Sequence, residues 1–152
     1  MSFIQPQILS GDMRIMAFIV AMTVMISPPA YATDAIERSV TGDWRFTAAL
    51  DGADIVALDE NEAHQLLGRI FSISRERIKF GNHVCGRTEF DATKVEPKRH
   101  LREAFHASAK KLKLPNPVTV VDLSCTSVFI KSQNRLVIFW QGWFFDATRI
   151  KN

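Results

Sequence analysis

The sequence predicts an α+β domain, mainly antiparallel β, that follows an N-terminal signal peptide. About eight short strands are expected to form a curved sheet or a small barrel with two helices. Three observations predict this class: an export pattern in the first 32 residues, β-branched and aromatic runs in the last third, and two helix-like stretches between them. No linker or internal repeat interrupts residues 33–152, so we expect one domain there, of about 120 residues.

The N-terminal stretch has the composition of a secretory signal peptide. Residues 13–32 read MRIMAFIVAMTVMISPPAYA, with an arginine, an apolar run, two prolines and an Ala-Tyr-Ala end in that order. This order predicts cleavage after Ala32 and a periplasmic or secreted protein, with a buried N-terminal helix as the alternative interpretation. The apolar run is shorter than the about 20 residues that cross a bilayer, so no membrane span is expected after cleavage. Met13 is a second candidate for the start of translation.

Charge and cysteine content narrow the class of protein further. The net charge is +3, and the Lys and Arg residues are scattered among acids, which does not favour a nucleic-acid partner. An even cysteine count in an exported chain predicts a disulfide between Cys85 and Cys125. The alternative is a metal site at His83 and Cys85, but two ligands do not complete a zinc shell. We therefore expect a disulfide, no metal and no cofactor.

The first half of the domain alternates strands with a short helix. Residues 43–50 place Trp44, Phe46 and Ala48 at alternate positions, which predicts a strand with these three side chains inward. A turn and a short strand over residues 55–58 are expected next. Residues 59–68 then predict a helix, because Asp59 and Glu62 can form a capping box and Gly68 can end the helix in a left-handed conformation.

A hairpin and a longer helix are expected in the middle of the chain. Residues 69–80 regain a period of two around a polar turn, and the hairpin closes at Gly81 and Asn82, directly before Cys85. Residues 98–113 predict the second helix, with one apolar stripe and three lysines in the last turn. The members of the stripe are Leu101, Ala104, Phe105, Ala109 and Leu112.

The last third predicts an antiparallel meander that is unusually rich in aromatic residues. Strands are expected near residues 118–124, 126–131, 135–141 and 143–149. Both faces of the last two strands carry aromatics, and Gly142 is expected to be a bulge between them. One face is expected to pack with Trp44, Phe46 and Phe105, and the other to line a cavity, lie under a helix or bind a partner. The candidate ligand- or partner-binding residues are Trp140, Trp143 and Phe144.

Catalytic motifs are missing from the sequence. It contains no GxSxG, HExxH, P-loop, GxGxxG or CxxC pattern, so no catalytic residue is nominated by a motif. Of the histidines, His64 has Glu60 four residues before it, a common surface pair. An envelope hydrolase whose site is assembled from His83, Asp54 and Ser124 remains the alternative function.

Several segments together resemble a group of small, mostly uncharacterised exported proteins of Gram-negative bacteria with one disulfide. They are Trp44, residues 57–68 (ALDENEAHQLLG), residues 77–85 (RIKFGNHVC), residues 112–115 (LKLP), residues 121–125 (VDLSC) and the closing Phe144, Phe145 and Arg149. The resemblance covers nearly all of residues 33–152. It implies an envelope location and a single domain, and it carries over no activity.

The first functional hypothesis is a small exported binding or inhibitor protein rather than an enzyme. The export signal, the disulfide and the missing catalytic set favour it. Its partner would be an envelope or secreted protein, or a small apolar ligand.

Overall fold

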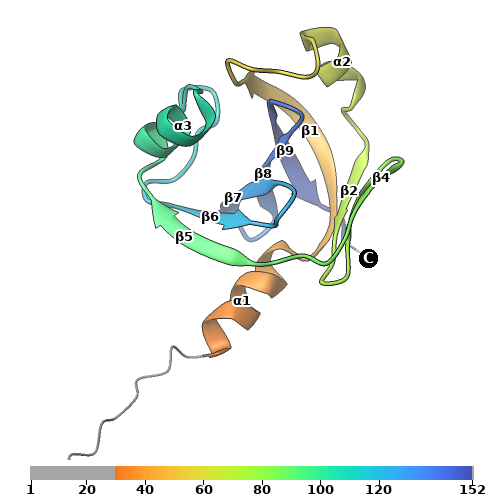
Figure 1. Ribbon diagram of the computed structural model, residues 1–152, viewed down its shortest axis with the longest axis vertical. Helices are drawn as coiled ribbons and strands as arrows, with labels where there is room; N and C mark the ends of the chain where they lie inside the picture. The colour runs from red at the N-terminus through yellow and green to blue at the C-terminus, as the bar shows by residue number, and fades with distance from the viewer. Residues whose placement is uncertain (1–29, 152) are drawn as a thin grey trace, which may run out of the picture.

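The computed structural model describes residues 30–151, with side chains from Thr33 onward. Its main feature is one sheet of nine antiparallel strands that curls into a half-barrel (Figure 1). The mainly antiparallel fold class predicted from the sequence is therefore confirmed. The elements are α1 (Ala30–Val40), β1 (Gly42–Gly52), α2 (Glu60–Gln65), β2 (Ile70–Ile73), β3 (Ile78–Phe80), β4 (His83–Cys85), β5 (Asp91–Val95), α3 (Pro97–Phe105), β6 (Val118–Asp122), β7 (Ser127–Ser132), β8 (Arg135–Trp140) and β9 (Trp143–Arg149).

The strands follow an up-and-down order that nearly closes on itself. The order across the sheet is β4-β3-β2-β1-β9-β8-β7-β6-β5, so the last strand pairs with the first. The two edge strands, β4 and β5, are consecutive in the chain, and residues 86–90 carry the chain from one edge to the other. The disulfide reinforces this crossing, because Cys85 at the end of β4 is bonded to Cys125 in the β6–β7 turn. The predicted pairing of the two cysteines is thus confirmed.

The concave face of the sheet is filled with aromatic side chains. Phe46 stacks on Phe145 with ring centroids 4.4 Å apart, and Trp140 meets the edges of Phe71 and Phe80 at 5.4 and 5.5 Å. Trp140 lies on β8, three strands away from β2 in the sheet, so these contacts cross the interior of the half-barrel. We call this group the inner core. These rings fill the interior of the half-barrel and exclude water from it, so their role is to pack the core.

A second core lies on the outer face of β6 to β9. Helix α3 and the segment that follows it cover this face, as the placement of α3 outside the sheet in Figure 1 shows. Phe105 of α3 meets Phe139 at 4.8 Å and Phe144 at 5.5 Å, and Phe129 at 5.7 Å. Both faces of β8 and β9 are therefore buried, one in the inner core and one under α3.

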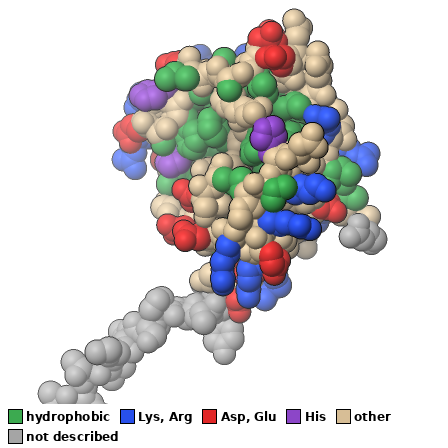
Figure 2. Space-filling view, turned by 45° about the vertical axis from the view of Figure 1, so that its right-hand side comes forward, with side chains coloured by type: hydrophobic (Ala, Val, Ile, Leu, Met, Phe, Trp, Pro, Cys, Tyr) green, Lys and Arg blue, Asp and Glu red, His purple; other side chains and the backbone are tan. Residues whose placement is uncertain are grey.

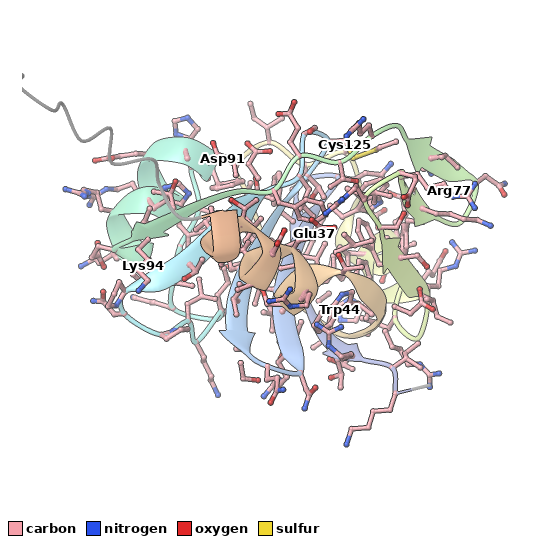
Figure 3. The ribbon with its side chains drawn as sticks, turned by 90° about the horizontal axis from the view of Figure 1, so that it is seen from below. Glu37, Trp44, Arg77, Asp91, Lys94 and Cys125 are labelled. Atoms are coloured by element: carbon pink, nitrogen blue, oxygen red, sulfur yellow. A yellow bond between two sulfur atoms is a disulfide. The ribbon has the colours of Figure 1, made fainter. Side chains whose placement is uncertain are left out.

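Helix α1 covers the lower end of the half-barrel. Figure 3 looks at this end from below and shows α1 in front of the strands, with Glu37 on it. Trp44 donates its indole N–H to the carbonyl of Val40 at 2.8 Å, and the guanidinium of Arg149 donates to the carbonyls of Ser39 and Thr41, both at 2.6 Å. Burial lowers the pKa of Arg149. Residues 1–29 of the predicted signal peptide lie outside the described residues.

Several local predictions are confirmed by the hydrogen bonding. Asp59 accepts the N–H of Glu62 at 2.8 Å and the carboxylate of Glu62 accepts the N–H of Asp59 at 2.8 Å, which is the predicted capping box. Gly68 has the predicted left-handed conformation, with a φ of 82°, but helix α2 ends earlier, at Gln65, and its C-cap is Leu66. The four strands predicted in the last third are β6 to β9.

Other predictions are wrong. The second helix ends at Phe105 rather than near residue 113, because His106 takes a left-handed conformation with a φ of 49° and Ala107 donates its N–H to Leu101. Leu112 is nevertheless buried in the outer core, from a loop. Gly142 is the second residue of a two-residue hairpin turn, not a bulge, since Trp140 pairs directly with Trp143.

Further differences between prediction and structure concern the first half of the domain. Residues 55–58 form a loop and not a strand. Strand β1 contains register shifts after Phe46 and after Ala49, so that Ala49, rather than Ala48, packs against the inner core. Strand β5 was not predicted, because its sequence, DATKV, lacks apolar alternation. Helix α1 was not predicted either.

Reduction of the disulfide is expected to destabilise the protein by about 4 kcal/mol, since the bond closes a loop of 40 residues. Urea unfolding of the oxidised protein and of a Cys85→Ser/Cys125→Ser variant measures this difference. A reductant should shift the unfolding midpoint of the parent protein and leave that of the variant unchanged. Equal midpoints for the oxidised parent and the variant would contradict the expectation.

Candidate functional site

The structure places the three predicted binding residues in different surroundings. Phe144 is fully buried in the outer core, and Trp140 is 9% exposed at the rim of the inner core. Trp143 is half-buried and donates its indole N–H to the carbonyl of Leu58 at 2.9 Å. Of the three, Trp143 therefore reaches toward a surface loop, which contains Leu58.

Residues 53–58 form a loop whose backbone is fixed to the β8–β9 turn. The N–H of Ala53 donates to the carbonyl of Gly142 at 2.8 Å, and the N–H of Ala57 donates to the carbonyl of Gln141 at 3.1 Å. The indole of Trp143 supplies a third hydrogen bond, to Leu58. We call residues 53–58 the clamped loop. Three hydrogen bonds over six residues restrict the backbone before any partner binds.

Gly142 makes this close approach possible. A Cβ atom at position 142 would lie 2.6 Å from the Cα of Val56 and 2.8 Å from the carbonyl oxygen of Ile55. The φ of Gly142 is also positive, at 88°. Glycine is thus required twice, for the conformation of the turn and for the space that the loop occupies.

The tip of the clamped loop exposes apolar side chains. Ile55 is 84% exposed and Val56 is 43% exposed, and Asp54 beside them is also exposed. An exposed apolar pair on a restricted backbone is the arrangement by which a binding loop presents an anchor side chain. Figure 2 shows hydrophobic side chains in the upper half of the visible face, the end at which Figure 1 places the β1–α2 connection.

A cleft of about 790 Å³ lies between the end of β1 and the C-terminal part of α3, next to the clamped loop. We call it the charged cleft, since cationic and anionic side chains both line it. The N–H of Asp54 donates to the carbonyl of His106 at 3.3 Å and so links the loop to the residue that ends α3. The lining residues with ionisable side chains are Asp51, Asp54, Lys98, Arg102, His106 and Lys110.

The residues of the alternative hydrolase hypothesis have separate neighbours. Asp54 lines the charged cleft, whereas His83 lines a smaller pocket of about 180 Å³ and meets Trp140 at 5.8 Å. The hydroxyl of Ser124 accepts the N–H of Glu89 at 3.2 Å. Each of the three side chains thus has its own local contacts.

The described part of the chain contains no cluster of metal-binding side chains. No group of three or more His, Cys, Asp and Glu residues there could hold a metal ion. The alternative to the disulfide was a metal site at His83 and Cys85. His83 lines a pocket, whereas Cys85 is bonded to Cys125. His64, on α2, contacts the carbonyl of Glu60 at 2.7 Å.

No family model, curated protein or solved structure matches this chain. The resemblance to exported proteins of Gram-negative bacteria therefore stays a prediction. Among residues 30–151, no helix is long and apolar enough to cross a membrane.

Two parts of this site did not follow from the sequence. Ile55 belongs to the IVAL run that favours a strand, and its exposure depends on the distant turn at Gly142. His106 lies within the predicted longer helix but outside its apolar stripe, and its place in the cleft depends on the helix ending at Phe105. The one local signal was glycine itself, which marks points of close backbone approach.

Gly142→Ala is expected to displace the clamped loop, because the added methyl group would overlap the loop backbone. Gly68→Ala is the matched control, since Gly68 has a similar φ of 82° but nothing within 4 Å of the added Cβ. We expect Gly68→Ala to cost about 1 to 2 kcal/mol for the left-handed conformation. Gly142→Ala should cost roughly 1 to 3 kcal/mol more, from the overlap.

Urea unfolding measures both losses, and amide hydrogen exchange at Ala53 and Ala57 reports on the loop. Exchange at these two amides should accelerate in Gly142→Ala and stay unchanged in Gly68→Ala. Equal losses of stability with protected amides in both variants would show that the loop does not depend on this glycine.

Proposed function

We propose that this protein is an exported binding protein that holds or inhibits a protein partner, which it contacts through the clamped loop. The observation that carries the proposal is the 84% exposure of Ile55 on a backbone held by three hydrogen bonds to the β8–β9 hairpin. A loop that is already ordered loses little conformational entropy on binding, so its anchor side chain adds affinity efficiently. The partner would be an envelope or secreted protein with an apolar recess that accepts Ile55.

The filled inner core supports a protein partner over a small apolar ligand. Phe46, Phe71, Phe80, Trp140 and Phe145 contact one another across the interior, with centroids 4.4 to 5.8 Å apart. An apolar ligand site in a β-barrel normally uses the space that these rings occupy. The outer surface, and the clamped loop on it, is therefore the better supported place for recognition.

The proposed location outside the cytoplasm rests on the disulfide and on the signal pattern of residues 13–32. Disulfides persist in the oxidising periplasm and in secreted proteins, and are rare where thiols are kept reduced. An envelope hydrolase is the less supported function, since its three nominated side chains have separate neighbours.

The proposal is tested with the protein obtained by expressing the full chain in a Gram-negative host. Periplasmic extract and culture medium are passed over the immobilised protein, and a panel of cell-wall lytic enzymes is assayed for inhibition. Ile55→Asp should weaken partner binding or inhibition by about tenfold or more, because a charge replaces the apolar anchor. Ile70→Asp is the matched control, since Ile70 is 46% exposed on β2, away from the loop.

The control variant should bind and inhibit like the parent protein. The proposal fails if no partner is retained reproducibly and no lytic enzyme is inhibited. It also fails if Ile55→Asp and Ile70→Asp lower binding equally, because the interaction would then not use the clamped loop.

A further inference from the structure

The charged cleft combines opposite charges that do not neutralise one another. Lys98 and Arg102 lie one helical turn apart on α3, Lys110 follows in the next segment, and Asp54 lies on the clamped loop. Within residues 33–151, none of these four side chains forms an ion pair, although all four line the same cleft. By contrast, Asp51, which also lines the cleft, is paired with Lys111 at 3.3 Å.

The three cations are arranged at a cost to stability. Two positive charges four residues apart on a helix destabilise it slightly, and a third cation facing the same cleft adds to the repulsion. A ligand with a negative group would relieve this repulsion. Arginine suits a carboxylate in particular, because its planar fork can donate two parallel hydrogen bonds.

The C-terminal end of α3 is a second indication that the charged cleft is a binding site. His106 has a φ of 49° at the position after the last helical residue, where glycine is usual. A residue with a side chain is less favourable there, and this residue lines the cleft. His106 also accepts the N–H of Asp54 through its carbonyl at 3.3 Å, so the end of the helix fixes the position of the acidic wall.

We propose that the charged cleft binds a small zwitterion, a short peptide whose carboxylate lies against Arg102 and Lys98 and whose ammonium group lies against Asp54. Free carboxylate and free ammonium groups match the unpaired cations on one wall and the unpaired acid on the other. A volume of about 790 Å³ is within the range of sites for molecules of this size. This site goes beyond the proposed function and does not rest on it, since the loop anchor Ile55 does not line the cleft.

The test titrates the protein from the full chain with trialanine, with N-acetyl-trialanine, which lacks the ammonium group, and with trialanine amide, which lacks the carboxylate. Isothermal titration calorimetry gives the affinities, and backbone amide NMR shifts locate the site. Trialanine should bind more tightly than either capped peptide and should shift amides in residues 51–54 and 106–110. Arg102→Gln and Asp54→Asn should each weaken trialanine binding by about tenfold.

The capped peptides assign each charge to its wall. Arg102→Gln should leave the affinity for trialanine amide unchanged, and Asp54→Asn should leave that for N-acetyl-trialanine unchanged. Arg77→Gln is the control, since Arg77 is exposed in the β2–β3 turn and does not line the cleft. Both cleft variants replace exposed side chains, and an unchanged melting temperature confirms that they are folded.

Three results would overturn the proposal. The first is that trialanine shifts no amide of the cleft, and the second is that the capped peptides bind as tightly as trialanine. The third is that inorganic phosphate binds as tightly as trialanine, which would reduce the cleft to a site for anions in general. None of these results bears on the clamped loop, because loss of partner binding in Ile55→Asp is measured independently.

Discussion

The pairing of β9 with β1 is the interaction on which the rest of the structure depends. It joins the first and last strands, over the register from Trp44 opposite Arg149 to Gly52 opposite Trp143. Two register shifts in β1 bend the pair, and bulges of this kind increase the local twist that lets a sheet curl. The curl brings β2 and β3 across from β8, so the rings of the inner core meet. Without this pairing, the two halves of the sheet would be separate and the inner core, which joins residues of both halves, would not form.

Both ends of the same strand pair carry the features that cover or extend the half-barrel. At the lower end, Arg149 of β9 donates hydrogen bonds to the carbonyls of Ser39, in the last turn of α1, and of Thr41, directly after it. Its guanidinium lies 4.2 Å from the ring centroid of Trp44 on β1. At the upper end, β1 continues into the clamped loop, and the β8–β9 turn holds that loop by its backbone. The β8–β9 hairpin is therefore a scaffold. Its aromatic side chains contribute to both cores, its turn positions the clamped loop, and most of its rings are not at the surface.

The sequence was most informative where one local signal decides the structure. The capping box at Asp59, the β-branched and aromatic runs in residues 118–149 and the cysteine pair each predicted what the structure contains. Local signals failed where tertiary contacts decide. The apolar stripe of residues 98–113 is buried at both of its ends, at Leu101 and at Leu112, but a loop carries the second of these, so periodicity alone overextended the helix. In the candidate site, Trp143 was predicted, whereas Ile55 and His106 depend on contacts between distant segments.

The clamped loop and the charged cleft share one structural support. This determines which substitutions affect one of the two sites and not the other. Asp54 belongs to the loop, lines the cleft and donates its N–H to the residue that ends α3. A change in the loop backbone would therefore move Asp54 in the cleft as well. A ligand bound at the cleft as proposed would stabilise the loop by the same free energy with which an ordered loop would favour the ligand. The two sites share backbone, but they use different side chains. Ile55 extends into solvent from the loop, and Arg102 lines the cleft from α3, so the proposed recognition of a protein and the proposed binding of a small charged ligand would use different atoms on one support.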